Sequence, residues 1–348
     1  MRQQPGSLSR LGWDDSFAAA FDALNLGRTI PARVVVVASH TVTVVAAISA
    51  YDVVLSSRVR ASPPAGGVTT GDWVAVDADS VHGVLPRRSA LLRRAAGAAA
   101  VAQAVAANVD VVFIAVPLGL DVAVRRLERS LAMVWSSGAR PIVLLTKADL
   151  SSDLAGDVDA ALKVAAGVEV IAVDDTGCGL DAVRLALAAR TTGAIIGPSG
   201  AGKSTLINAL CSRARLATAT VRDDGRGRHT TTRRELVELP GGGLLIDTPG
   251  MREMGVWDAH AGIDTVFADI VELASRCRFN DCCHQHEPGC AVLEAAHQDA
   301  SIPARLASLR KLEREQRFAD RQVDARLRAE ASRQHRRWAR AVRSQPHR

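Results

Sequence analysis

The stretch Gly197-Pro198-Ser199-Gly200-Ala201-Gly202-Lys203-Ser204 connects an apolar run, Thr192–Ile196, to a helical pattern that begins at Ser204. It matches G-x-x-x-x-G-K-[ST], in which glycines let backbone N–H groups reach phosphate oxygens and the helix N-terminus adds positive potential. We expect Lys203 to contact the β- and γ-phosphates and the Ser204 hydroxyl to bind Mg²⁺. The stretch, extended to Thr205, predicts a nucleotide site, with a chance glycine turn as the alternative.

Downstream, the strand-like run Leu244–Asp247 continues into Thr248-Pro249-Gly250. An Asp at the end of a strand with a Gly three residues later forms D-x-x-G. Asp247 can hold Mg²⁺ through water, and the amide of Gly250 can sense the γ-phosphate. Alone, this is a common turn sequence, but together with the phosphate loop it indicates a nucleotide hydrolase.

Upstream, the strand-like run 142–145 ends in Thr146-Lys147-Ala148-Asp149. The Asp149 carboxylate can accept both N–H groups on the Watson–Crick edge of guanine, which adenine does not offer, and the stem of Lys147 can cover the base. The T-K-x-D motif therefore favours GTP over ATP. The alternative is an ordinary strand-to-helix turn with Asp149 near a helix start.

The order of the three motifs is unusual. In ordinary GTPases the guanine motif follows the phosphate loop and D-x-x-G, whereas here it precedes both. A permuted order keeps the same sheet and site but moves the chain ends. The segment that leaves D-x-x-G runs directly into the C-terminal region, so the nucleotide state can be transmitted to whatever that region binds.

Strand-like and helical runs alternate between residues 108 and 210, which predicts a parallel α/β sheet with its ligand site at the carboxyl ends of the strands. These runs are 109–116, 122–136, 142–145, 153–166, 168–173, 180–189, 192–196 and 204–210. Before them, short β-rich runs predict a small OB-type barrel. These are 33–38, 41–48, 53–59, 73–76 and 81–85. Such barrels often bind RNA, and a purely structural β module is the alternative.

The chain has 348 residues, of which 48% are hydrophobic and 23% charged, so it can form two or three domains with sizeable cores.

Charge is distributed unevenly along the chain. Residues 305–348 hold 13 Arg and one Lys against five acidic residues, a net charge of +9, so the rest of the chain has a net charge of −3 and the whole chain +6. Leu306, Leu309 and Leu312 have helical spacing there, so one face can pack while the other meets the phosphates of an RNA. A solvated helix is the alternative. Because 3% of residues are aromatic, RNA contact must rely on phosphates and shape.

The N-terminus lacks the apolar core of a secretory signal, and the most apolar stretch, residues 95–120, contains polar residues and a proline. We therefore expect a cytoplasmic protein with no membrane span. In that reducing compartment, four cysteines in one short window favour a metal over disulfides. The pattern Cys277-x4-Cys282-x-His284-x5-Cys290 offers three thiolates and one imidazole, a set that suits one structural Zn²⁺. Cys283 and His286 are adjacent alternatives, and buried free cysteines are the other interpretation.

Together these motifs resemble the ribosome biogenesis GTPase A family, circularly permuted GTPases that act on the small ribosomal subunit. The resemblance spans nearly the whole chain and includes three further stretches: Leu85-Pro86-Arg87-Arg88-Ser89, Ala106-Ala107-Asn108-Val109-Asp110 and Gly227-Arg228-His229-Thr230-Thr231-Thr232. It implies an OB barrel, a permuted GTPase and a C-terminal zinc module, with GTP hydrolysis stimulated by the small subunit during its late maturation. It also assigns the metal ligands to Cys277, Cys282, His284 and Cys290.

Two positions depart from that family. Thr146 stands where the family usually has Asn, so an amide contact near the base is lost or replaced by a hydroxyl. We expect weaker nucleotide binding from this change, with guanine selection preserved by Asp149. The segment 173–179, expected to support the base, lacks the usual Ser-Ala pair, so a contact there falls to its backbone.

A water-orienting glutamine is missing as well. Many GTPases have Gln directly after D-x-x-G, and this chain has Met251, which cannot polarise water. Slow intrinsic hydrolysis is expected unless another group enters on partner binding. His229 is the candidate for that group, and Thr231 is the expected Mg²⁺ ligand beside it. A surface-loop role for His229 is the alternative.

The sequence thus predicts an α/β fold in which a circularly permuted P-loop GTPase domain (91–257) follows an N-terminal OB-type RNA-binding β-barrel (29–90) and precedes a C-terminal helical zinc-binding module (258–302). An extension (1–28) and a basic helix or tail (303–348) flank them. The predicted function is that of a monomeric, Mg²⁺-dependent GTPase that binds the immature small ribosomal subunit and its rRNA, cycles between GTP and GDP, and hydrolyses GTP to drive its own release. The catalytic candidates are Lys203, His229, Asp247 and Gly250. The alternatives are a P-loop ATPase or nucleotide kinase, and a largely non-catalytic zinc and OB RNA-binding protein.

Overall fold

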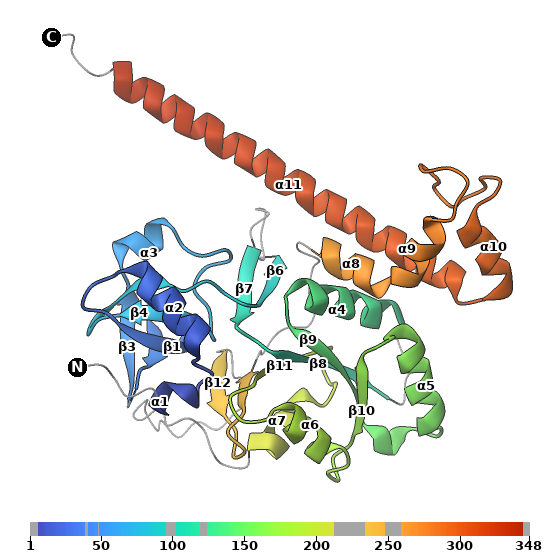
Figure 1. Cartoon of the computed structure of the whole chain (residues 1–348), viewed down its shortest axis with the longest axis horizontal. Coiled ribbons are helices and arrows are strands. Elements are labelled where there is room, and N and C mark those ends of the chain that lie inside the picture. Colours follow the sequence, from blue (N-terminus) through green and yellow to red (C-terminus); the bar gives the residue numbers. More distant parts are fainter. Residues whose placement is uncertain are drawn as a thin grey trace.

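A computed structural model describes residues 6–38, 41–47, 49–94, 102–118, 124–211, 234–247 and 259–343. Figure 1 shows a small barrel near the N-terminus, a sheet flanked by helices, and a long C-terminal helix that extends beyond both. None of the described helices combines the length and the apolar character that crossing a membrane requires.

Five strands close into the predicted OB-like barrel, because β1 pairs with both β2 and β4. They are β1 (Ile30–Val37), β2 (Val42–Val45), β3 (Ala50–Leu55), β4 (Trp73–Val76) and β5 (Ser80–Val84). One predicted strand was too long: the run 53–59 ends as a strand at Leu55, and Ser57–Ala61 forms helix α3. The Ser56 hydroxyl accepts a hydrogen bond from the amide of Val59, so a local cap stops the strand and starts the helix.

The barrel continues directly into the α/β sheet, whose strand order is β10-β9-β8-β11-β13-β12, followed by β1. The strands are β8 (Val111–Pro117), β9 (Arg140–Thr146), β10 (Glu169–Val173), β11 (Thr192–Ile196), β12 (Glu235–Glu238) and β13 (Leu244–Asp247). All neighbours from β10 to β13 are parallel, whereas β12 is antiparallel to both β13 and β1. Parallel pairing places the carboxyl ends of β9, β8, β11 and β13 along one edge.

Helices cover both faces of this sheet, and they are α4 (Val124–Ser136), α5 (Leu154–Val164), α6 (Leu180–Ala186) and α7 (Lys203–Cys211). Successive residues of a strand point to opposite faces. Ile114 packs in the same core as Leu127 of α4, while its neighbour Phe113 packs in the core that contains Val183 of α6 and Leu206 of α7. Burial on both faces explains why these strands read as continuous apolar runs.

Strand β12 was not predicted from the sequence, and neither were the N-terminal helices nor a hairpin that follows the barrel. The N-terminal residues form helices α1 (Gly6–Ser9) and α2 (Asp15–Leu24), and the latter packs Phe17 against Trp73 of the barrel, with ring centroids 5.6 Å apart. A separate hairpin, β6 (Ala90–Arg94) and β7 (Ala102–Ala107), follows the barrel. Its Arg94 hydrogen-bonds to Gln322, so the hairpin contacts the long C-terminal helix.

The C-terminal helices dock on α4, and they are α8 (His260–Val266), α9 (Ala268–Ala274), α10 (Ala291–Gln298) and α11 (Ile302–Arg343). Arg305 of α11 pairs with Glu128 of α4, at 3.2 Å, and with Asp269 of α9. Its guanidinium also lies 5.5 Å from the ring centroid of Phe267. Burial raises the pKa of the fully buried Glu128, and Arg305 offsets part of that effect. Arg305 therefore contributes to packing rather than to an exposed basic surface.

Gly262 is where α8 approaches α4 most closely, and its replacement by Ala is expected to lower the free energy of unfolding by about 1–3 kcal/mol. A Cβ there would lie 1.8 Å from the carbonyl oxygen of Ala132 and 2.6 Å from Oγ of Ser136, which now accepts the Gly262 amide at 2.8 Å. Urea unfolding of G262A measures the loss. The control is G241A, where a Cβ meets nothing within 4 Å. Equal stability of the two variants would contradict this packing.

Candidate functional site

The phosphate loop joins β11 to α7 in a conformation that glycine permits. Gly200 and Gly202 both have φ of 76°, in the left-handed region, and a Cβ at Gly197 would lie 2.6 Å from the carbonyl oxygen of Ala115 in β8. Lys203 Nζ donates to the carbonyl oxygens of Gly197 at 2.8 Å and Pro198 at 2.6 Å. The lysine ammonium is thus held over the loop that carries the candidate phosphate-binding amides.

The guanine motif lies beside this loop. It follows β9, where Lys147 adopts a left-handed conformation (φ 59°, ψ 44°) and Asp149 stands exposed in a single 3-10 turn, Ala148–Leu150. An ideal Cβ at Gly202 would lie 3.9 Å from the Cβ of Thr146. The permuted chain therefore brings the two motifs together at one edge of the sheet, because β9, β8 and β11 run parallel.

The buried hydroxyl of Thr146 is unpaired among the residues that the structure describes. The residue is 3% exposed, and none of the described residues forms a hydrogen bond with its hydroxyl. An unpaired buried hydroxyl costs about 1–3 kcal/mol, so a polar group of a ligand or of a shifted loop is favoured next to it. The departure from Asn at this position thus leaves a hydrogen-bonding group beside the phosphate loop.

The segment 173–179 is ordered by an aspartate that the sequence analysis did not single out. The Asp174 carboxylate accepts hydrogen bonds from the Thr176 hydroxyl at 2.8 Å and from the amides of Thr176 and Cys178 at 3.0 and 2.9 Å. The Thr176 hydroxyl is the main cause that lowers the pKa of Asp174. The run Asp174-Asp175-Thr176-Gly177 is rich in residues that favour such turns, which was the available signal. The loop follows β10, next to the strand that carries the guanine motif.

Two of the three candidate Mg²⁺ ligands, Ser204 and Asp247, lie within the described residues. Asp247 ends β13, which pairs in parallel with β11, and Ser204 lies in the first turn of α7. A carboxylate and a hydroxyl at one sheet edge fit Mg²⁺, which prefers hard oxygen ligands. Thr231, His229, Gly250 and Met251 lie outside the described residues, and their roles remain predictions.

Cys277, Cys282, His284 and Cys290 form the second candidate site, with ligand atoms that all lie within 4.8 Å of one another. Cys277 Sγ is 3.8 Å from Cys290 Sγ and 3.6 Å from His284 Nδ1, and His284 Nδ1 is 3.4 Å from Cys290 Sγ. Ligands around a tetrahedral Zn²⁺ are spaced at about 3.8 Å (S···S) and about 3.6 Å (S···N). The group can therefore hold a metal ion. Cys283 Sγ instead bonds the carbonyl of Asp281.

Two residues that were not predicted as ligands form hydrogen bonds with the backbone of the candidate metal loop, residues 277–290. The Glu287 carboxylate accepts the amides of Cys283 at 2.8 Å and Gln285 at 2.7 Å, and backbone hydrogen bonds of this kind lower its pKa to about 2. Arg310 of α11 donates to the carbonyl oxygens of Cys283 and His284 at 2.6 and 2.8 Å. Arg310, which belongs to the basic segment 305–348, thus positions the backbone of a candidate metal ligand, His284.

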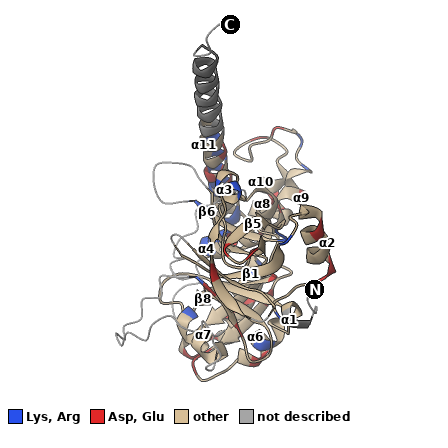
Figure 2. Cartoon of the chain, turned by 90° about the vertical axis from the view of Figure 1, so that its left-hand side faces the viewer, with Lys and Arg blue, Asp and Glu red and all other residues tan. Residues whose placement is uncertain are grey.

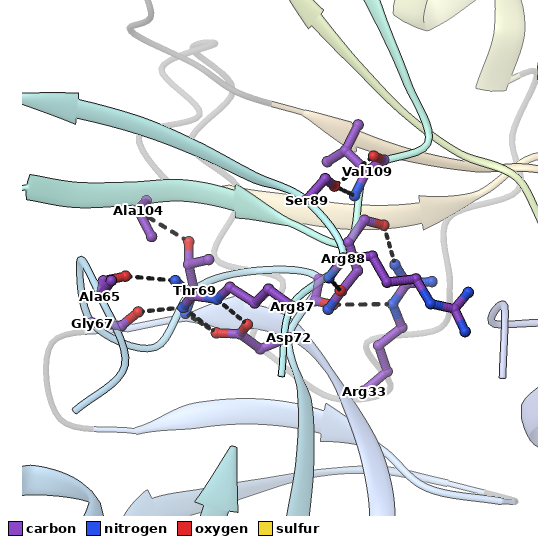
Figure 3. Close-up of polar contacts among 12 residues, drawn as sticks. Arg33, Ala65, Gly67, Thr69, Asp72, Arg87, Arg88, Ser89, Ala104 and Val109 are labelled. Atoms are coloured by element: carbon purple, nitrogen blue, oxygen red, sulfur yellow. Dashed lines mark hydrogen bonds and ion pairs between the residues drawn. The ribbon is translucent and has the colours of Figure 1, made fainter. Parts of the chain in front are cut away.

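The stretch Leu85 to Ser89 forms the joint between barrel and sheet (Figure 3). Arg87 donates to both carboxylate oxygens of the buried Asp72, at 2.7 and 2.8 Å. Burial raises the pKa of Asp72, and Arg87 opposes that effect. The amide of Arg88 bonds Asn108 Oδ1 at 3.0 Å, and the Ser89 hydroxyl accepts the amide of Val109 at 2.7 Å. Two stretches that carry the resemblance therefore hold each other in place.

Comparison with known proteins agrees with this architecture. Residues 84–257 match the family model described as RsgA GTPase. The small ribosomal subunit biogenesis GTPase RsgA of Streptomyces coelicolor is 46% identical, over 95% of this chain and 92% of that protein. The protein of the same name from Opitutus terrae is 40% identical, over 91% of this chain and 92% of its own length.

Two solved structures share the fold. YjeQ from Thermotoga maritima superimposes with a TM-score of 0.59 and 22% identity, covering 82% of this chain and 97% of that one. YloQ, described as a circularly permuted GTPase, gives a TM-score of 0.58 and 20% identity, over 83% and 97%. The barrel, the permuted order of nucleotide motifs, the Cys and His cluster and the matches across most of the chain lead to one conclusion. The chain belongs to the RsgA GTPase family.

Proposed function

We propose that this chain is a Mg²⁺-dependent GTPase that binds the immature small ribosomal subunit in the cytoplasm and hydrolyses GTP during late maturation to drive its own release. The observation that carries the proposal is the closeness of two loops: a Cβ added at Gly202 of the phosphate loop would lie 3.9 Å from the Cβ of Thr146, where the T-K-x-D motif begins. The names of the relatives, small ribosomal subunit biogenesis GTPases, support the partner.

In this proposal, residues 197–205 bind the phosphates and residues 146–149 the guanine base. Lys203 contacts the transferred phosphoryl group, and Ser204, Thr231 and Asp247 hold Mg²⁺, which neutralises charge on the β- and γ-phosphate oxygens. Gly250 senses the γ-phosphate, and His229 enters to orient water when the subunit binds.

Strand β12 is the proposed route from nucleotide state to RNA binding. It follows the segment that carries His229 and Thr231, and its Glu235 pairs with Val36 of the barrel strand β1. The hydroxyl of Thr70, also in the barrel region, donates to the carbonyl oxygen of Arg234 at 3.3 Å. A movement of the segment before β12 would therefore act on the barrel.

The rRNA contacts are proposed to come from the barrel and from α11. Figure 2 shows Lys and Arg on α3 and along the described part of α11. Arg314, Arg317 and Arg321 of α11 are exposed, unlike Arg305. Contacts of this kind go to phosphates and weaken with salt. We also propose that the metal is a single structural Zn²⁺ and that the protein acts as a monomer.

Single-turnover GTP hydrolysis with and without small ribosomal subunits tests the function. Because Met251 stands at the usual glutamine position, we expect slow turnover alone and an increase of at least about 100-fold with subunits. ATP should not compete for the site. If subunits do not change the turnover, the protein is a nucleotide-dependent RNA-binding protein and the proposed function is wrong. If ATP competes with GTP, the site belongs to a P-loop ATPase.

A further inference from the structure

We propose that a cavity at the joint of the N-terminal helices, the barrel and the sheet binds a small oxyanion of the size of phosphate. The cavity measures about 230 Å³ and is bordered by Arg33, Trp73, Arg88 and Arg190, among others. This exceeds the space of a single water, about 30 Å³, and falls below the 300–1,000 Å³ of sites for drug-sized ligands. Its size fits a small ion.

The cavity lies at the amino ends of β8 and β11, whereas the nucleotide loops follow the carboxyl ends of the strands. Asp110 directly precedes β8 and Thr192 begins β11, and both line the cavity. The phosphate loop follows the other end of β11, roughly 13 Å away at ~3.3 Å per residue. An ion bound in the cavity would therefore occupy a different site from the phosphates of GTP.

Arg33 places a buried positive charge on the cavity wall. It is 1% exposed, and within the described ranges its hydrogen bonds go to neutral acceptors: the carbonyl oxygens of Leu11, Gly71 and Asn108 and the Thr192 hydroxyl. Burial lowers its pKa to about 10, and the charges of Asp110 and Asp72 offset that only in part. Since no described carboxylate pairs with it directly, an anion nearby would stabilise this charge.

Trp73 carries a second buried donor. It is 0% exposed, and its indole Nε1 has no hydrogen-bond partner among the described residues. It lines the cavity beside Arg33, whose guanidinium carbon lies 5.3 Å from the ring centroid. A buried N–H without an acceptor costs about 1–3 kcal/mol. Trp13 packs edge-on against Trp73 at 4.7 Å, which holds the ring in place.

Arg88 and Arg190 complete the cationic wall. Arg88 pairs with Asp14, and its guanidinium carbon lies 3.9 Å from the ring centroid of Phe17. Arg190 donates through Nε to the carbonyl oxygen of Ser9 at 3.1 Å and through Nη2 to that of Trp13 at 3.0 Å, whereas its Nη1 has no acceptor in the described part of the chain. These contacts fix both side chains at the cavity before an ion arrives.

The net charge of the lining favours an anion. Three guanidinium groups, those of Arg33, Arg88 and Arg190, face two carboxylates, those of Asp14 and Asp110. The hydrogen bond from Arg88 lowers the pKa of Asp14, so this carboxylate stays ionised at neutral pH. The lining thus has one excess positive charge, together with the N–H donors of Trp73 and Arg190. A small oxyanion carries the opposite charge and accepts several hydrogen bonds at once.

The test titrates inorganic phosphate into the full-length protein loaded with GDP and Mg²⁺, against sodium chloride of equal ionic strength. We expect a saturable rise in melting temperature with phosphate beyond that with chloride. W73F keeps an aromatic side chain but removes the pyrrole ring that carries the donor, and it should weaken the apparent affinity about three- to tenfold; R190Q should weaken it about tenfold or more. R140Q changes the charge equally at an exposed pair with Glu169 and should titrate like the wild type.

Two results would overturn the proposal. One is a phosphate response no larger than that of chloride. The other is a response that W73F and R190Q both retain, because binding would then lie elsewhere, for example beside GDP in the nucleotide site. Neither result depends on whether the protein acts on ribosomal subunits, so this site and the proposed function fail independently.

Discussion

Replacing Asp149 by Asn is expected to lower the affinity for GDP and GTP by about 100-fold or more, while the affinity for xanthosine nucleotides rises. A carboxylate accepts two N–H groups from guanine, whereas an amide accepts one and presents its own N–H₂ to the other. Xanthine carries a carbonyl where guanine carries its amino group, so it matches the amide. A site that leaves a polar group unpaired discriminates by large factors.

Equilibrium binding of GDP and of xanthosine diphosphate to the wild type and to D149N measures whether the preferred base changes from guanine to xanthine. D159N is the matched control, since it removes the same charge from an exposed residue of α5 that pairs with Lys163. An unchanged preference for GDP in D149N would show that the base lies elsewhere, and the proposed guanine site would be wrong.

Replacing Cys290 by Ser is expected to reduce the bound metal from about one ion per chain to nearly none and to unfold the loop between α9 and α10. Cys290 is buried among the other candidate ligands and immediately precedes α10. Structural Zn²⁺ contributes on the order of 10 kcal/mol to the folding of small zinc modules, so loss of one ligand removes much of the order in this region.

Elemental analysis of the purified, reduced protein measures the metal, and limited proteolysis reports on residues 275–299. C283S is the control, because Cys283 is adjacent in sequence but stands outside the ligand group. Equal metal loss in C283S, or a wild-type protein without metal, would contradict the assignment of these four ligands.

Local motifs explain why much of the fold was predictable and why the candidate nucleotide loops could be located in the sequence. The phosphate loop, the guanine motif and Asp247 each follow an apolar strand directly, and a strand buried on both faces is recognisable from its own residues. The parallel pairing of β9, β8 and β11 then brings the loops to one edge. The domain boundaries and the individual site residues remain predictions that binding experiments will test.

Non-local pairing explains what was missed. The hairpin β6 and β7 lies in an alanine-rich stretch without polar alternation, and its strands are specified by each other and by contact with α11 rather than by their own pattern. The charge of the basic segment did not show which of its arginines face solvent. Arg305 and Arg310 resemble the others in sequence, yet Arg305 packs against the buried Glu128 and Arg310 donates to the backbone of the candidate metal loop.

The sequence by itself determined the kind of chemistry to expect, because the candidate residues for phosphate, guanine and metal binding occur in short segments whose backbone geometry is set locally. Tertiary structure alone decided which segments meet. The joining of β12 to the barrel, the docking of the C-terminal helices on α4 and the cavity around Arg33 all depend on residues far apart in the chain. Such contacts form only once burial of the cores offsets the entropy of closing long loops, and no local pattern records which distant partner each surface will find.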